Sequence, residues 1–135
     1  MAQIIFVNLP VIDLQRATSF YTQLGFATNP QFSGQFATCI VISDTIFVML
    51  LTARFFATFT MRPVADASEL TESIHALSAD SRDEVDRLFA RAMAAGGQEA
   101  RPAEDYALMY TRSFHDPDGH LWELLYMDPR GVAQE

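Results

Sequence analysis

Cysteine, basic residues and long apolar runs are all scarce in this chain of 135 residues. The one cysteine, Cys39, excludes an intramolecular disulfide and a cysteine-rich zinc site, and its apolar neighbours indicate a small core residue. Nine Lys and Arg against 17 Asp and Glu give a net charge of −8. Nucleic-acid binding relies on basic side chains that neutralise phosphates, so this charge argues against it.

Membrane and export signals are also missing from the sequence. The longest apolar run, residues 46–51, is far shorter than the roughly 20 residues of a membrane-spanning helix. The N-terminus has neither a basic region nor the long apolar stretch of a signal peptide. There is no glycine-rich phosphate loop and no Gly-x-Ser-x-Gly nucleophile motif. We therefore expect a cytoplasmic protein that binds neither nucleic acid nor membrane.

Each half of the chain predicts a strand, a helix and then further strands. In the first half we expect a strand over 4–11, a helix from the N-cap Asp13 to Gly25, and an antiparallel pair over 36–42 and 45–51. In the second half we expect a strand over 73–79, a helix that begins at Ser81 and ends at Gly96, a weak edge strand over 98–103, and a hairpin of 108–114 with 121–127. These elements predict one domain over 1–128, with modules at about 3–52 and 71–128, a connection over 53–70 and a tail over 129–135.

The connection begins with an aromatic stretch. Thr52 is a suitable N-cap for a short helix that carries Phe55, Phe56 and Phe59 and ends at Arg62-Pro63. These side chains either dock onto the core, cover a ligand cavity, or form a contact between subunits.

An internal repeat relates the two halves. Residues 44–51 align with residues 118–125 without a gap. A duplication of this size indicates two copies of one β-α-β-β-β unit. The predicted fold is α+β, with paired βαβββ modules whose curved sheets form an open surface around a cup-shaped ligand cavity.

Two motifs give the sequence a family resemblance. Residues Val11-x-Asp13-Leu14-x-x-Ala17-x-x-Phe20-Tyr21-x-x-Leu24-Gly25-Phe26 resemble the first-module signature of the vicinal oxygen chelate superfamily, and Asp116-Pro117-Asp118-Gly119-His120-x-Trp122-Glu123-Leu124 resembles its closing hairpin. This superfamily includes glyoxalase I, extradiol dioxygenases, fosfomycin-resistance enzymes and bleomycin-binding proteins. The resemblance spans residues 3–128 and implies the glyoxalase-like fold and a homodimer, but no single reaction.

The resemblance also implies four positions for metal ligands, usually His or Glu. These positions are Phe6, Met49, Ile74 and Glu123 in this sequence. Three of them offer no oxygen or nitrogen donor to a hard or borderline cation. We therefore expect no bound metal and no cofactor. A divalent ion such as Zn, Ni, Mn or Fe, if one binds, would have to lie at Glu123.

We predict that a small molecule contacts a set of mainly apolar side chains together with a few polar ones. The predicted binding residues are Phe6, Asn8, Phe47, Met49, Ile74, Tyr110, Arg112 and Glu123. Glu123 is also the candidate catalytic residue, as a general base or a hydrogen-bond acceptor, and is expected either to pair with Arg112, Tyr110 or Asn8 or to have a raised pKa. Strand alternation leaves two options for residues 108–114, because the other face would present Met109, Thr111 and Ser113.

Three hypotheses about function follow. The first is a protein without a metal that binds a small, partly apolar molecule. The second is a metal-dependent enzyme, either a lactoylglutathione lyase-like lyase, an epimerase or a dioxygenase, which uses Glu123 and a nearby histidine. His75 lies one residue from a ligand position, so its side chain is expected on the opposite face. The third is an association protein whose contact surface includes Phe55 and Phe59.

Overall fold

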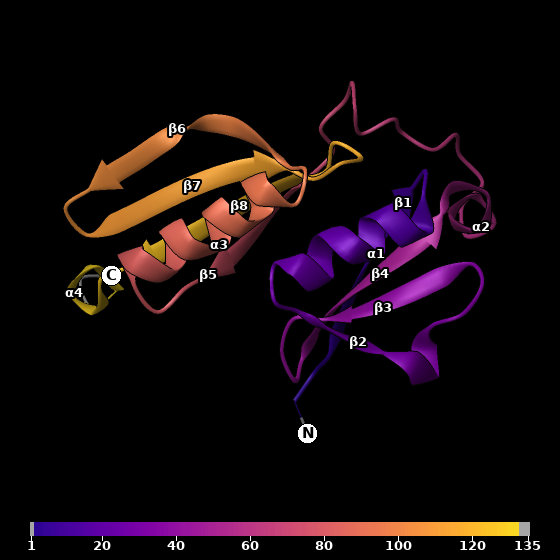
Figure 1. The fold of residues 1–135 in the computed structure, drawn as a ribbon, viewed down its shortest axis with the longest axis horizontal. Helices are drawn as coiled ribbons and strands as arrows, with labels where there is room; N and C mark the ends of the chain where they lie inside the picture. Colours follow the sequence, from indigo (N-terminus) through magenta and orange to yellow (C-terminus); the bar gives the residue numbers. More distant parts are fainter. Residues whose placement is uncertain (1, 133–135) are drawn as a thin grey trace. The chain divides into compact units, whose positions relative to one another are not determined.

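The computed structural model describes residues 2–132. The chain divides into two compact units, Met1–Asp66 and Ala67–Glu135, and the boundary falls inside the predicted connection. Figure 1 draws the first unit in indigo to magenta and the second in salmon to yellow. Within the described residues, no helix combines the length and apolar content needed to cross a membrane.

The first unit contains one four-stranded sheet. Its elements are β1 (Ile5–Val11), α1 (Leu14–Gln23), β2 (Ala27–Asn29), the 3-10 turn η1 (Pro30–Phe32), β3 (Ala37–Val41), β4 (Ile46–Thr52) and α2 (Ala53–Ala57). The strand order is β1-β4-β3-β2, in which β1 runs parallel to β4 and the other pairs are antiparallel.

The second unit repeats this arrangement. Its elements are β5 (Ile74–Ser78), α3 (Arg82–Ala94), β6 (Gln98–Tyr106), β7 (Met109–His115), β8 (Leu121–Met127) and α4 (Pro129–Val132). The strand order is β5-β8-β7-β6, again with one parallel pair at the edge. Two open, mixed four-stranded sheets with helices confirm the predicted α+β, glyoxalase-like fold.

The helix boundaries follow from the predicted caps. The Asp13 carboxylate accepts a hydrogen bond from the backbone N–H of Arg16 at 3.0 Å, and the Ser81 hydroxyl accepts one from the backbone N–H of Glu84 at 3.1 Å. Beyond the helix ends, Gly25 and Gly96 have φ values of 110° and 109°, a conformation that favours glycine. Local sequence therefore sets where both helices begin and end.

Each unit packs its long helix against one face of its own sheet (Figure 1). In the first unit, the core under α1 includes Phe20, Tyr21, Ile40 and Leu50, all 1% exposed or less. In the second unit, the core under α3 includes Val85, Phe89, Phe114 and Trp122. We call the opposite side of each sheet its open face, because neither long helix covers it.

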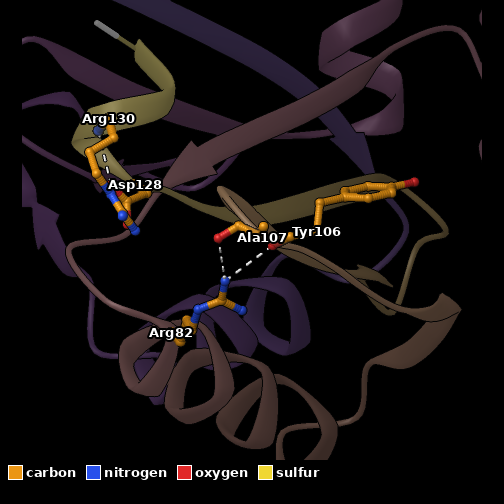
Figure 2. Close-up of polar contacts among 5 residues, drawn as sticks. All are labelled: Arg82, Tyr106, Ala107, Asp128 and Arg130. Atoms are coloured by element: carbon orange, nitrogen blue, oxygen red, sulfur yellow. Dashed lines mark hydrogen bonds and ion pairs between the residues drawn. The ribbon is translucent and has the colours of Figure 1, made fainter. Parts of the chain in front are cut away.

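The side chain of Arg82, at the start of α3, links the β6–β7 hairpin to that helix. Its guanidinium donates to the carbonyl oxygens of Tyr106 at 3.1 Å and Ala107 at 3.4 Å, as Figure 2 shows, and it pairs with Asp105. These contacts hold the turn between β6 and β7 in place. β6 continues to Tyr106, whereas the sequence predicted a strand only to residue 103.

The start of the predicted C-terminal tail is helical. Asp128 accepts a hydrogen bond from the backbone N–H of Arg130 at 2.9 Å and pairs with its guanidinium at 3.0 Å (Figure 2). Pro129–Val132 form α4 after this residue, and residues 133–135 lie outside the described part of the chain.

Candidate functional site

The four binding residues predicted for the first module lie together on the open face of the first sheet. β1 and β4 pair with Phe6 beside Phe47 and Asn8 beside Met49. The residues of these strands that alternate with them, including Val48 and Leu50, belong to the core under α1. The same alternation that buries one set of side chains therefore directs the other set outward.

An aromatic platform forms the centre of this face. The rings of Phe6 and Phe47 stack with their centroids 5.1 Å apart and an interplanar angle of 18°. Phe32, from η1, meets Phe6 edge-on at 6.3 Å. Phe6 remains 43% exposed and Phe32 48% exposed. The sequence analysis missed Phe32, because only the turn after Pro30 brings it onto this face.

Asn8 supplies a polar group beside the platform. Its side-chain N–H donates to the carbonyl oxygen of Phe6 at 3.2 Å, which leaves the amide oxygen as a hydrogen-bond acceptor. Cys39 pairs with Met49 across the sheet and is fully buried, and this burial raises the pKa of its thiol. A thiol with a raised pKa is a poor nucleophile, so Cys39 is a packing residue, as predicted.

The open face of the second sheet carries Ile74 and Glu123. The register places Ile74 beside Leu121, and Glu123 between Ala76 on β5 and Ser113 on β7. Ile74 is 60% exposed, whereas Glu123 is half-buried. All four positions that the family resemblance implies for metal ligands therefore lie on the open faces. They are Phe6 and Met49 in the first unit, and Ile74 and Glu123 in the second.

Tyr110 and Arg112 do not lie on this open face, and the prediction that they do is wrong. They share a face with Phe114, which is 1% exposed and pairs with Trp122 in the core. Burying the Phe114 ring under α3 fixes the orientation of the whole strand. The alternative option is confirmed, since Met109, Thr111 and Ser113 take the open face.

The side chains of Tyr110 and Arg112 instead tie β7 to α3 and β6. The Tyr110 hydroxyl donates to the Asp86 carboxylate, and this hydrogen bond raises the pKa of the tyrosine. The Arg112 guanidinium lies 3.7 Å from the centroid of the Phe89 ring and pairs with Asp86 at 3.5 Å and Glu99 at 3.2 Å. These contacts explain why Arg112 does not pair with Glu123.

Within its own unit, the side chain of Glu123 has no hydrogen bond or ion pair to a described residue. The predicted pairing with Arg112 or Tyr110 is therefore wrong. Asn8 lies in the other unit, and its pairing with Glu123 stays a prediction. Its cross-strand neighbour Ser113 and the nearby Thr111 are 7% and 8% exposed, and neither hydroxyl has a partner among the described residues of this unit. One acceptor and two buried hydroxyls thus lie on one face without side-chain partners in the unit.

The histidines of the second unit do not join Glu123. The His75 ring contacts Trp122 at 5.0 Å on the helix side, as its position one residue from Ile74 predicted. His115 uses Nδ1 to contact the carbonyl oxygen of Gly119 at 3.1 Å, and His120 is buried. Burial lowers the pKa of His75, which favours its neutral form.

The family's divalent metal does not fit the donors on these faces. Of the four implied positions, Phe6, Met49 and Ile74 offer no oxygen or nitrogen, and only Glu123 carries a carboxylate. No group of three or more His, Cys, Asp or Glu suited to a metal ion occurs among residues 2–132. A hard cation needs several such ligands, so the side chains at these positions suit an organic molecule better.

Comparisons with known proteins agree with this architecture. The family model of the Glyoxalase/Bleomycin resistance protein/Dioxygenase superfamily matches residues 3–124. The structure of a hypothetical protein, SA1046, from S. aureus is 28% identical with a TM-score of 0.79, over 93% of this chain and 94% of that one. A glyoxalase-related enzyme from Fulvimarina pelagi is 23% identical with a TM-score of 0.78, over 93% and 88% of the two chains.

A fosfomycin resistance protein, FosX, from Mesorhizobium loti is 18% identical with a TM-score of 0.72, over 98% of each chain. At this identity the likeness shows the fold alone. No curated protein matches the chain. Because the family model covers almost the whole sequence and the fold agrees, this chain belongs to the glyoxalase/bleomycin resistance protein/dioxygenase superfamily.

Proposed function

We propose that this protein binds a small, partly apolar molecule on the open faces of its sheets, without the divalent metal that its superfamily usually holds. The observation that supports the proposal most directly is the half-exposed stack of Phe6 on Phe47 at a position where the family usually has a metal ligand. Exposed aromatic clusters of this kind are typical of binding surfaces.

The energetics favour an aromatic or aliphatic ligand. Each Å² of apolar surface that is removed from water contributes about 25 cal/mol to the free energy of binding. A ring that stacks on Phe6 or meets Phe32 edge-on adds about 0.5–1.5 kcal/mol beyond that area term. The Asn8 oxygen provides a directional contact for an N–H or O–H group of the ligand. A protein that binds without reacting in this way sequesters or carries its ligand.

The test uses the neutral fluorescent probe N-phenyl-1-naphthylamine, which brightens in an apolar environment. We expect binding to the wild-type protein and about tenfold weaker binding to the double variant Phe6→Ala, Phe47→Ala, because two stacked rings are lost. The matched control is Phe59→Ala, since Phe59 is 69% exposed and packs on Phe55 rather than on the platform. Equal loss in both variants would contradict the proposal.

The metal question is tested separately, by elemental analysis and native mass spectrometry of untagged protein purified without chelators. We expect substoichiometric metal and the mass of a homodimer. Near-stoichiometric Zn, Ni, Mn or Fe that disappears in Glu123→Ala would replace this proposal with the alternative, a metal-dependent lyase, epimerase or dioxygenase.

A further inference from the structure

We infer that the open face of the second sheet binds the ammonium group of an organic amine, with the Glu123 carboxylate as its principal acceptor. This inference rests on the proposed function and deepens it, because it specifies the charge of the ligand. The observation behind it is a half-buried carboxylate with two neighbouring hydroxyls, none of which has a side-chain partner among the described residues of its own unit.

The arrangement of acceptors matches an ammonium group. Ser113 lies directly across the β7–β8 ladder from Glu123, and Thr111 is its neighbour along β7 on the same face. The backbones of diagonal neighbours of this kind lie about 7–8 Å apart, a separation that a long side chain such as that of Glu123 can span. An ammonium group has three N–H donors and no acceptor, so one carboxylate and two hydroxyls satisfy it.

No arginine among the described residues of the second unit pairs with Glu123. Arg112 is turned toward α3, where Asp86 and Glu99 pair with it. Arg101 lies beside Ser113 in the register, but its guanidinium is 2.7 Å from Glu104 and is neutralised there. The side chain of Glu123 therefore has no basic partner within its own unit, and a partly buried polar group without a partner is unfavourable until one binds.

The charge of the whole unit adds to this preference. Residues 67–135 contain six Arg and 14 Asp or Glu, so 6 − 14 = −8. Such a surface attracts cations and repels anions at a distance. A single carboxylate is too few for a hard divalent metal, whereas it is sufficient for a charge-assisted hydrogen bond to a nitrogen.

The experiment is a chemical-shift titration of the ¹⁵N-labelled full chain with benzylamine, which is protonated at pH 7, and with the neutral benzyl alcohol. We expect benzylamine to shift the backbone amides of Ala76, Ser113 and Glu123. In Glu123→Gln its affinity should fall about tenfold or more, because a charge-assisted contact is lost. The affinity for benzyl alcohol should stay within twofold.

Two further variants complete the design. Ser113→Ala should weaken benzylamine binding several-fold, and it provides an independent test if Glu123→Gln fails to fold. Glu72→Gln removes an exposed charge from the same unit and should leave the affinity unchanged. Binding of benzylamine that survives in Glu123→Gln, or that is lost equally in Glu72→Gln, would overturn the inference.

A metal control and a probe control separate the remaining outcomes. Stoichiometric displacement of benzylamine by Zn²⁺ would overturn the inference in favour of a metal site at Glu123. Binding of N-phenyl-1-naphthylamine to Glu123→Gln should match the wild type. If that probe fails on the wild-type protein while benzylamine binds, the aromatic platform of the first unit is not a binding surface and the amine site stands; the reverse result overturns the amine site alone.

Discussion

The two units of this molecule have the same strand order but differ in composition and net charge. Nine of the 11 phenylalanines lie in residues 1–66, where three Arg balance three Asp to give a net charge of zero. The second unit contains two phenylalanines, all three histidines and the entire net charge of −8. Each unit needs apolar side chains on the face that its long helix covers, because burying them stabilises the fold. The side chains of the open face can therefore differ between the units.

The turn before the last strand of each sheet also differs between the units. The repeat aligns Thr45 with Gly119. Gly119 has a φ of +96°, and a Cβ at this position would lie 2.5 Å from the carbonyl oxygen of Ala67. The second unit therefore packs its connecting backbone against its turn and requires glycine there.

The largest expected effect tests this difference. Gly119→Ala should lower the free energy of unfolding by about 2 kcal/mol or more, because it strains the backbone and forces Ala67 away. The control Gly34→Ala in the first unit should change it by less than about 0.5 kcal/mol, since a Cβ there meets open space. Urea denaturation of both variants measures the difference, and equal destabilisation would show that the contact with Ala67 contributes nothing.

A smaller effect concerns the ion pairs of the second unit. Arg112→Met should cost about 1–2 kcal/mol, because the Phe89 contact and two charged hydrogen bonds are lost. Arg101→Met, which removes a more exposed pair, should cost about 0.5 kcal/mol or less.

Arg112→Met also tests the corrected position of Arg112. Because its side chain faces α3, Arg112→Met should leave the affinities for both N-phenyl-1-naphthylamine and benzylamine within twofold of wild type. A tenfold loss of either affinity would return Arg112 to the ligand site and contradict the strand orientation described above.

The smallest effect is a pH dependence that belongs to the second unit, since the first contains no histidine. Burial against Trp122 lowers the pKa of His75 below the value of about 6.5 expected in the unfolded chain, and the nearby His120 acts in the same direction while Asp116 opposes it. Between these two pKa values the unfolded state binds more protons. Stability should therefore be complete above pH 6.5 and decline as the pH falls below it.

Thermal denaturation between pH 5 and 8 measures this decline. His75→Gln, which cannot titrate, should give a flatter profile over the same range. An identical slope in the variant and the wild type would assign the pH dependence to other groups.

Much of the fold was predictable because its signals are local. The caps at Asp13 and Ser81 and the glycines after both helices act within a few residues. The strand β2 was not located, because three residues carry too little pattern to distinguish a strand from a turn. The aligned repeat correctly placed Met49 and Glu123 at equivalent positions, since two copies of one unit share a register.

The candidate site was predictable only in part. Phe6, Asn8, Phe47 and Met49 follow one alternation that the neighbouring core residues fix. On β7, by contrast, polar and apolar residues occur at both parities, so alternation alone permits either orientation. Phe32 reaches the platform through a turn, and nothing in its immediate sequence indicates that contact.

By itself, then, the sequence determined the duplicated α+β frame, the family and the loss of metal-binding side chains at three positions, because these depend on local pattern and residue type. Only the tertiary structure decided which face of β7 lies under α3, since that choice depends on burying Phe114 and on ion pairs formed with distant residues. The same packing directs Arg112 away from Glu123 and leaves that carboxylate without a partner among the described residues of its own unit.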